Sequence, residues 1–208
     1  MRTTREELIR EYRRLGWWSD TRITDLFDAA AASASSQLAV LDPPNRDVLV
    51  GGSPLRLTFK DVADLADGFA LRLLELGLDR DDILVTQLPN IAQYPALYLA
   101  ALRLGIIVSP VPMQYRRHEL EQIVDLTGAR ALLTVPTLKG VDYATDAMEL
   151  GRSRPLQVLC LGTDAPEGSL PFVPAALTPQ SRAALAAHAS AVQGTAEYVR
   201  ANFGACGI

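Results

Sequence analysis

The sequence predicts an α/β fold in which a layered, parallel-rich sheet is connected by crossover helices. Four short apolar segments have the length and composition of buried strands: residues 83–88, 106–109, 131–135 and 156–161. Segments with helical spacing of apolar side chains, or with capping residues, lie between them. Strands that alternate with helices in this way are typical of right-handed βαβ units and therefore of a parallel sheet.

An amphipathic helix is expected at the start of the chain. Residues 1–16 mix acidic and basic side chains, and Thr3 or Thr4 can cap the helix. One side of this helix carries apolar side chains, which are Leu8, Ile9, Tyr12 and Leu15. Trp17 and Trp18 follow, and we expect this aromatic pair to clamp the helix to the body of the protein.

A second helix is expected over residues 23–34, with Thr24 as its N-cap. Its inward side chains are expected to be Leu26, Phe27 and Ala30. A strand that begins at residues 40–41 ends at Pro43. Residues 42–54 are rich in Pro, Gly and Asp, and they predict a turn between two hairpin-like strands.

The clearest helix signal lies over residues 57–76. Thr58 is a good N-cap, and the Asp61 carboxylate can accept hydrogen bonds from amides that the helix leaves free. Apolar side chains at helical spacing define one buried face: Val62, Leu65, Ala66, Phe69, Leu73 and Leu76. Gly77 is placed to end the helix in a left-handed turn, and Leu78 can pack back on it.

A well-buried helix is expected over residues 91–104, because these residues are apolar on most sides. Gly105 is its stop, and the helix can start later than residue 91 because Pro95 is tolerated only near a first turn. Residues 117–127 and 143–150 predict two further helices.

The last part of the chain predicts a loop followed by a helix. Residues 163–177 are rich in Pro, Gly and Ala. Thr178 and Pro179 form a good helix start as N-cap and first helical residue. Residues 180–202 are rich in alanine, which has the highest helix propensity.

Composition excludes several classes of function. The chain has 208 residues, 49% hydrophobic and 21% charged, with a net charge of −4, which gives no reason to expect nucleic-acid binding. Cys160 and Cys206 lie far apart, so neither a disulfide framework nor a zinc site is expected, and a reducing cytoplasm fits. No apolar run has membrane-spanning length, and the charged start does not resemble a signal peptide.

Short motifs point to a family. Residues 57–62 read Leu-Thr-Phe-Lys-Asp-Val, residues 88–90 read Leu-Pro-Asn, and residues 102–112 read Leu-Arg-Leu-Gly-Ile-Ile-Val-Ser-Pro-Val-Pro. They resemble the L-[TS]-Y-x-E-L, L-P-N and L-K-A-G-x-A-Y-x-V-P motifs of the adenylate-forming enzymes, which include acyl-CoA synthetases, aryl-acid ligases and luciferases. Residues 127–130 resemble the family's S-G-A-R. The Y-R-x-x-G-W-W opening at residues 12–18 resembles ligases that activate aryl or cyclic acids.

The resemblance implies the N-terminal subdomain region of a carboxylic-acid:CoA ligase, with ATP, Mg²⁺ and CoA as the cofactors of the full-length family and a carboxylic acid as substrate. The family's glycine-rich Y-T-S-G-T-T-G-x-P-K-G loop, which holds the ATP phosphates, does not occur in the sequence, nor does the later lysine that contacts the acyl-adenylate. Negative charge develops on the phosphates in the transition state of adenylation, and backbone amides, cations and Mg²⁺ must stabilise it. We therefore expect no adenylation activity from this chain alone, as for a frameshifted or truncated product, and we assign no catalytic, cofactor-binding or metal-binding residue.

Several other residues resemble parts of known sites but lack the neighbours that such sites need. Gly51 and Gly52 lack the Lys-Ser/Thr that follows a phosphate loop, so a plain turn is expected there. Lys139 precedes a glycine but has the wrong neighbours for the family loop. His118 has no serine, cysteine or second histidine near it in sequence, so a catalytic role is not expected. Residues 113–117 are read either as a loop that approaches the acyl site or as a surface loop with two solvated arginines.

Three segments are expected: residues 1–54 with helices, strand and turn, residues 55–162 with the βαβ core, and residues 163–208 with the loop, the alanine-rich helix and a tail unlike the family. An exposed sheet edge would favour self-association and marginal stability. Two alternatives stay open. The chain can be a non-catalytic module or half of a split enzyme that a partner chain completes, or it can be an unrelated small α/β binding protein.

Overall fold

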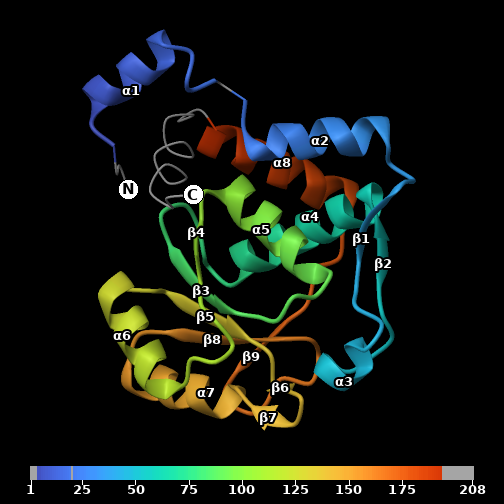
Figure 1. The fold of residues 1–208 in the computed structure, drawn as a ribbon, viewed down its shortest axis with the longest axis vertical. Helices are drawn as coiled ribbons and strands as arrows, with labels where there is room; N and C mark the ends of the chain where they lie inside the picture. The colour runs from blue at the N-terminus through green and yellow to red at the C-terminus, as the bar shows by residue number, and fades with distance from the viewer. Residues whose placement is uncertain (1–3, 20, 194–208) are drawn as a thin grey trace.

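The computed structural model describes residues 4–19 and 21–193. Its centre is a five-stranded sheet in the order β4-β3-β5-β8-β9, in which every neighbouring pair is parallel (Figure 1). The strands are β3 (Ile83–Gln87), β4 (Ile107–Pro110), β5 (Ala131–Thr134), β8 (Gln157–Leu161) and β9 (Leu170–Phe172). The predicted parallel-rich sheet with crossover helices is confirmed, and the four apolar segments supply its first four strands.

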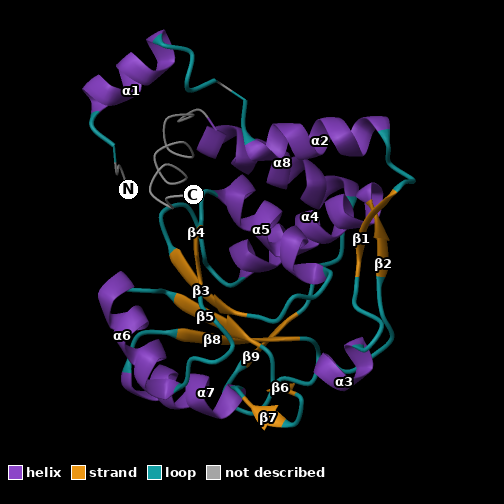
Figure 2. Cartoon of the chain, in the orientation of Figure 1, coloured by secondary structure: helices purple, strands orange, loops and turns teal. Residues whose placement is uncertain are grey.

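Helices cover both faces of this sheet, so the fold has three layers (Figure 2). One face carries α4 (Phe59–Glu75) and α5 (Gln93–Leu104), and the other carries α6 (Arg117–Thr127) and α7 (Ala144–Ser153). Successive strand residues point to opposite faces. Leu84 lies in the core cluster with α4 and α5, and Val85 lies in the cluster with α6 and α7. Burial on both faces explains why these strands are continuous apolar runs.

A small second sheet lies beside the main one. β1 (Leu38–Leu41) pairs antiparallel with β2 (Arg56–Thr58), as the hairpin prediction requires. The expected plain turn between them is wrong in part, because it contains the short helix α3 (Arg46–Val50). Asp42, which precedes this helix, forms an ion pair with Arg46, its first residue.

The predicted cap of α4, the glycines that end α4 and α5, and the place of Pro95 near the start of α5 are confirmed. The Thr58 hydroxyl accepts a hydrogen bond from the Asp61 amide at 3.2 Å, and the Asp61 carboxylate accepts one from the Thr58 amide at 2.8 Å. Gly77 and Gly105 end the two helices at φ values of 78° and 71°, a region that glycine enters without strain. Pro95 falls in the first turn of α5, where it removes no helical hydrogen bond.

The expected N-caps at Thr4 and Thr24 are wrong. α1 (Glu6–Arg14) begins after Arg5, and α2 (Ile23–Ser33) begins after Arg22, where Thr24 is a buried residue inside the helix. The Asp25 carboxylate accepts a hydrogen bond from the Arg22 amide at 2.9 Å. The acceptor at the start of α2 is therefore the Asp25 carboxylate in the first turn, where a threonine hydroxyl was expected to cap the helix.

Two apolar expectations near the N-terminus are also wrong. Leu26 is 62% exposed instead of inward. Trp17 follows α1 and is 69% exposed, and its ring packs on Tyr12 of α1 at a centroid distance of 5.5 Å. Trp18 also contacts the Tyr12 ring, at 5.3 Å. The aromatic pair thus braces the end of α1 itself.

Three short strands of the described structure were not predicted from the sequence. β6 (Thr137–Leu138) and β7 (Val141–Asp142) form a hairpin whose turn residues, Lys139 and Gly140, both have positive φ. β9 lies inside the segment expected to be a loop and adds to the edge of the main sheet next to β8. Strands of two or three residues carry no readable periodicity.

The chain ends, as far as it is described, in α8 (Pro179–Gln193), which packs on α4 and α5. Its start is as expected, since the Ser181 amide donates to the Thr178 hydroxyl at 3.0 Å. Thr3, Cys206 and the expected continuation of the helix to residue 202 lie outside the described residues. Among the helices that are described, none is long and apolar enough to cross a membrane.

Candidate functional site

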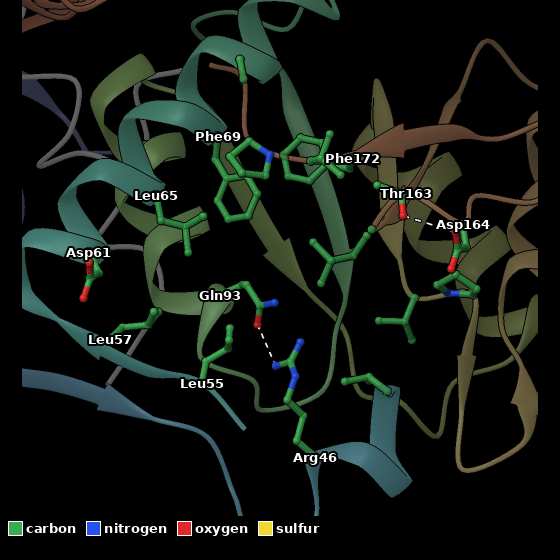
Figure 3. A pocket seen from close by; sticks show the side chains of 18 of the residues that line it. Arg46, Leu55, Leu57, Asp61, Leu65, Phe69, Gln93, Thr163, Asp164 and Phe172 are labelled. Carbon is green, nitrogen blue, oxygen red and sulfur yellow. Dashed lines mark hydrogen bonds between the residues drawn. The ribbon is translucent and has the colours of Figure 1, made fainter. Parts of the chain in front are cut away.

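A pocket of about 880 Å³ opens at the carboxyl edge of the parallel sheet (Figure 3). The carboxyl ends of parallel strands meet at one edge, and ligands of open α/β sheets bind there. Val135 directly follows β5, and Gly162 and Thr163 directly follow β8. The opposite wall comes from α3, β2, α4 and the start of α5. The pocket therefore lies between the main sheet and the N-terminal hairpin.

A buried charged network forms the floor of this pocket. The Arg46 Nη1 donates to the Asp42 carboxylate at 2.7 Å and to Gln93 Oε1 at 3.0 Å. Asp42, which is 3% exposed, also accepts hydrogen bonds from the amides of Leu55 and Ala92 at 2.9 and 2.7 Å. These contacts tie the hairpin to the N-terminal end of α5 and fix the position of Arg46.

The side walls are apolar. Phe69 of α4 and Phe172 of β9 stack with their ring centroids 5.1 Å apart. Leu57, Leu65 and Val135 also line the pocket (Figure 3). Apolar walls with a few fixed polar groups are the usual composition of small-molecule sites.

Acidic side chains lie on the α4 side of the pocket. The hydrogen bond from Lys60 Nζ, at 2.5 Å, lowers the pKa of Asp64 below its ordinary value, and Arg182 of α8 also pairs with this carboxylate at 2.8 Å. The Thr58 hydroxyl and amide lower the pKa of Asp61 by hydrogen bonding to its carboxylate. Both groups are therefore anionic at neutral pH and already have partners.

The Leu-Pro-Asn corner lies at the carboxyl end of β3. The Gln87 side chain, fully buried, donates to the carbonyl of Tyr115 at 2.7 Å and to that of Pro112 at 3.3 Å. Thr86 and Tyr94 share a hydrogen bond of 2.7 Å between their hydroxyls. These bonds hold the loop after β4 and the start of α5 against the sheet edge.

The two arginines that follow that loop, Arg116 and Arg117, are exposed and form ion pairs on the surface. Arg116 pairs with Asp146 at 2.8 Å, and its guanidinium lies 4.9 Å from the centre of the Tyr143 ring. Arg117 pairs with Glu121 at 3.1 Å and also with Glu149. Both side chains are exposed and neither lines the pocket, as the surface-loop alternative predicts, and their ion pairs also join α6 to α7.

The other residues weighed in the sequence also lie away from the pocket. His118 is on α6 and its Nε2 lies 3.0 Å from Gln122 Nε2, which is a contact within one helix. Lys139 is in the β6–β7 turn, and Gly51 and Gly52 follow α3. Cys160 is buried in β8 and free, and burial raises the pKa of its thiol.

Sequence reasoning missed the residues that form the pocket floor. Asp42 and Arg46 lie four residues apart, but Pro43 and Pro44 separate them and Asp42 precedes α3, so the pairing rule for helices did not identify them as partners. Gln93 lies 47 residues from Arg46, so no local pattern could join them.

The pocket offers few groups that could meet the charge of a nucleoside triphosphate. Over residues 4–19 and 21–193, no group of three or more His, Cys, Asp or Glu side chains could hold a metal ion. The pocket offers a single buried guanidinium, whereas a triphosphate needs a row of amides or several cations.

Comparisons with known proteins give one consistent family. The family model described as AMP-binding enzyme matches residues 37–191. The chain is 29% identical over 166 residues to a salicylyl-CoA synthase / salicylate adenylyltransferase of Streptomyces sp., covering 77% of this chain and 28% of the relative. It is 33% identical over 123 residues to a 2-hydroxy-7-methoxy-5-methyl-1-naphthoate–CoA ligase of Streptomyces carzinostaticus, covering 58% of this chain and 22% of the relative.

A solved structure has the same fold. The apo structure of Mycobacterium smegmatis MbtA matches with a TM-score of 0.63 and 25% identity, over 85% of this chain and 33% of that one. The chain therefore spans between a fifth and a third of the lengths of these three proteins.

Proposed function

The chain belongs to the AMP-binding enzyme family, and on this premise we propose that it is the N-terminal part of an AMP-dependent carboxylic-acid:CoA ligase. The observation that carries the proposal is the match over residues 37–191, which includes the β1–β2 hairpin, all five strands of the parallel sheet and the Leu-Pro-Asn corner. In the full-length enzyme, ATP, Mg²⁺ and CoA would be the cofactors and a carboxylic acid the substrate. The names of the two Streptomyces relatives support an aryl acid as that substrate.

The role proposed for this chain is structural support of the active site. Its sheet and the loop after β4 present a rigid edge, because Gln87 and Tyr94 bind neighbouring segments at that edge. The groups that meet the charge of the ATP phosphates would come from outside these 208 residues. We therefore propose that the chain by itself does not form acyl-adenylate. A cytoplasmic location is part of the proposal, and the free buried thiol of Cys160 supports it.

Carboxylate-dependent exchange of pyrophosphate into ATP tests the proposed inactivity. The purified chain, with salicylate or benzoate as the acid, is expected to give no exchange above the value without acid. Exchange that depends on the acid would contradict it.

Sequencing of the coding DNA beyond codon 208 tests whether the chain is the N-terminal part of a longer ligase. A Y-T-S-G-T-T-G-x-P-K-G stretch downstream, in any of the three frames, is the expected result. Its absence in all three frames would contradict the proposal that the chain is the N-terminal part of a longer ligase and would direct the search to a separate chain that completes the fold.

A further inference from the structure

A second hollow, which we call the α2 groove, lies where α2 packs on α4 and α5 and where β1 packs on α4 (Figure 1). Its larger part has a volume of about 530 Å³. A part of about 320 Å³ adjoins it and shares three lining residues with it, Val40, Pro95 and Tyr98. The two parts form one continuous groove, which has no lining residue in common with the pocket at the carboxyl edge of the sheet.

The walls of the α2 groove are apolar and partly exposed. None of the described residues that line its larger part is charged, and Tyr98 carries the one polar group among their side chains. Ile23 and Leu26 of α2 line this part and are 48% and 62% exposed, and Leu41 of β1 lines the adjoining part and is 53% exposed. Contiguous apolar surface of this kind marks interaction sites in soluble proteins.

The edges of the main sheet are less suited to association than the α2 groove. β4 and β9 lie at the two ends of the strand order, and they contain Pro110 and Pro171. Proline has no amide hydrogen to donate to a neighbouring strand, and these strands have only four and three residues. The self-association that the sequence led us to expect at a sheet edge is therefore assigned to the groove.

The shape of the α2 groove suits a second copy of the same surface. Ile23 and Leu26 form an exposed ridge on α2, and Phe27, Val40 and Tyr98 line the hollow beside it. In a contact with two-fold symmetry both copies present the same surface, so the ridge of each can enter the hollow of the other. Ridges that enter grooves are also the usual way in which helices pack.

The size of the α2 groove suits a stable dimer. Eleven residues line its larger part and eight line the adjoining part, with three in common, so sixteen residues contribute. An interface of standard size uses roughly 20–30 residues on each side. The groove thus supplies more than half of the residues that such an interface needs.

The charges beside the α2 groove also favour a second copy. Arg22 pairs with Asp25 of α2 at 2.5 Å, and Arg103 of α5 pairs with Asp28 of α2 at 2.6 Å. Both signs of charge therefore flank the groove in every copy, and two-fold symmetry can set the acidic groups of one copy against the basic groups of the other. A partner with charges of a single sign would meet its own sign here.

We propose that the α2 groove is the interface between two copies of the 208-residue chain, with Leu26 of each copy seated in the hollow of the other. The proposal goes beyond the function proposed above and does not depend on it, because the contact involves neither a nucleotide nor an acid. Dimerisation and the origin of the chain as part of a ligase can therefore succeed or fail separately.

Sedimentation velocity of the 208-residue chain over a series of protein concentrations tests this interface. We expect a dimer whose fraction rises with concentration, and no larger species, because a two-fold contact closes on itself. Leu26→Glu places a charge in the centre of the interface and should weaken dimerisation by about ten-fold or more. Leu26→Met keeps an apolar side chain and should dimerise within about three-fold of the parent.

The matched control is Leu126→Glu, which adds the same charge on α6 at a residue that is 87% exposed. Its dimerisation should stay within about two-fold of the parent. Urea unfolding shows which variants fold as the parent does. Leu41→Glu changes β1 instead of α2, is expected to weaken the dimer in the same direction, and replaces Leu26→Glu if that variant does not fold.

A chain that stays monomeric at every concentration would overturn the proposal. So would equal dimerisation of Leu26→Glu and Leu126→Glu, which would place the contact elsewhere on the surface. Growth of species larger than the dimer would contradict the two-fold arrangement and would indicate an open, head-to-tail contact instead.

Discussion

Phe69 of α4 stacks on Phe172 of the edge strand β9, with an interplanar angle of 18° between the rings. Both side chains are at most 1% exposed, although they lie more than a hundred residues apart in the sequence. The contact fixes the last strand of the sheet under the helix layer. It also explains how a strand of only three residues is held in place.

Substitution Phe172→Ala should therefore lower the free energy of unfolding by about 3–5 kcal/mol, because a buried ring is lost and a cavity remains. Urea unfolding followed by circular dichroism measures this change. The control Leu170→Ala changes a 41% exposed side chain of the same strand and should cost less than about 1 kcal/mol. Similar losses for the two variants would show that β9 is not anchored by the ring pair.

Gly68 in α4 should resist substitution in spite of its helical position. A Cβ at Gly68 would lie 2.7 Å from the Pro174 Cβ and 3.1 Å from the Ala175 carbonyl oxygen. Helix propensity alone predicts that Gly68→Ala stabilises by about 1 kcal/mol. The close approach of the segment after β9 predicts instead a loss of about 1–3 kcal/mol.

Thermal and urea unfolding of Gly68→Ala decide the sign of this effect. The reverse change Ala63→Gly, in the same helix, serves as the control and should cost about 1 kcal/mol through backbone entropy alone. A stabilised Gly68→Ala protein would mean that the segment around Pro174 does not pack on α4.

The cap of α4 should make stability depend on pH. Hydrogen bonds from Thr58 lower the pKa of Asp61 below its ordinary value of 3.8. A carboxyl group whose pKa is lower in the folded state stabilises the fold above its unfolded pKa, and this contribution is lost as the pH falls through the folded value. Parent and Asp61→Asn should therefore differ at pH 7, and this difference should shrink progressively as the pH falls below about 4, towards the lower pKa of the folded state.

Urea unfolding of both proteins between pH 3 and pH 7 checks this convergence. Glu167→Gln, an exposed carboxyl outside any cap, should follow the parent over the whole range. The variant Thr58→Ala should lose about 1 kcal/mol at neutral pH, since its hydroxyl is the other half of the cap. A difference between parent and Asp61→Asn that is as large at pH 3 as at pH 7 would contradict the role of the Asp61 charge.

Arg103 of α5 should stabilise the packing of this helix on α4 because it pairs with the half-buried carboxylate of Asp67. It donates to Asp67 of α4 at 2.5 Å and to Asp28 of α2 at 2.6 Å. Burial raises the pKa of Asp67 even though arginines pair with it. Replacement Arg103→Met removes a partner from this carboxylate and should cost about 1–3 kcal/mol at pH 7.

The loss in Arg103→Met should shrink as the pH is lowered. Without Arg103 the pKa of Asp67 rises further, so the folded variant takes up a proton earlier and the unpaired charge disappears. Arg154→Met, which breaks a pair with the exposed Asp125, should cost less than about 1 kcal/mol and serves as the control. A loss in Arg103→Met that is the same at pH 4 and pH 7 would rule out this electrostatic explanation.

The features that the sequence predicted best are those that depend on residues close to one another in the chain. The Thr58–Asp61 cap and the Gly77 and Gly105 stops were predicted correctly, because each depends on residues within one or two turns. The expected cap at Thr24 was wrong because Asp25 offered a competing local acceptor. Leu26 was assigned inward from spacing alone, and spacing does not say whether a neighbour covers the helix face.

By itself, the sequence determined the order of the elements, the parallel sheet and the family, since apolar periodicity, caps and short motifs are local in the chain. Tertiary structure alone decided that β9 joins the sheet and that Arg46 meets Gln93 at the floor of a pocket. Such contacts join residues far apart in sequence, and which of them form depends on how the layers pack. No pattern within a single segment can carry that information.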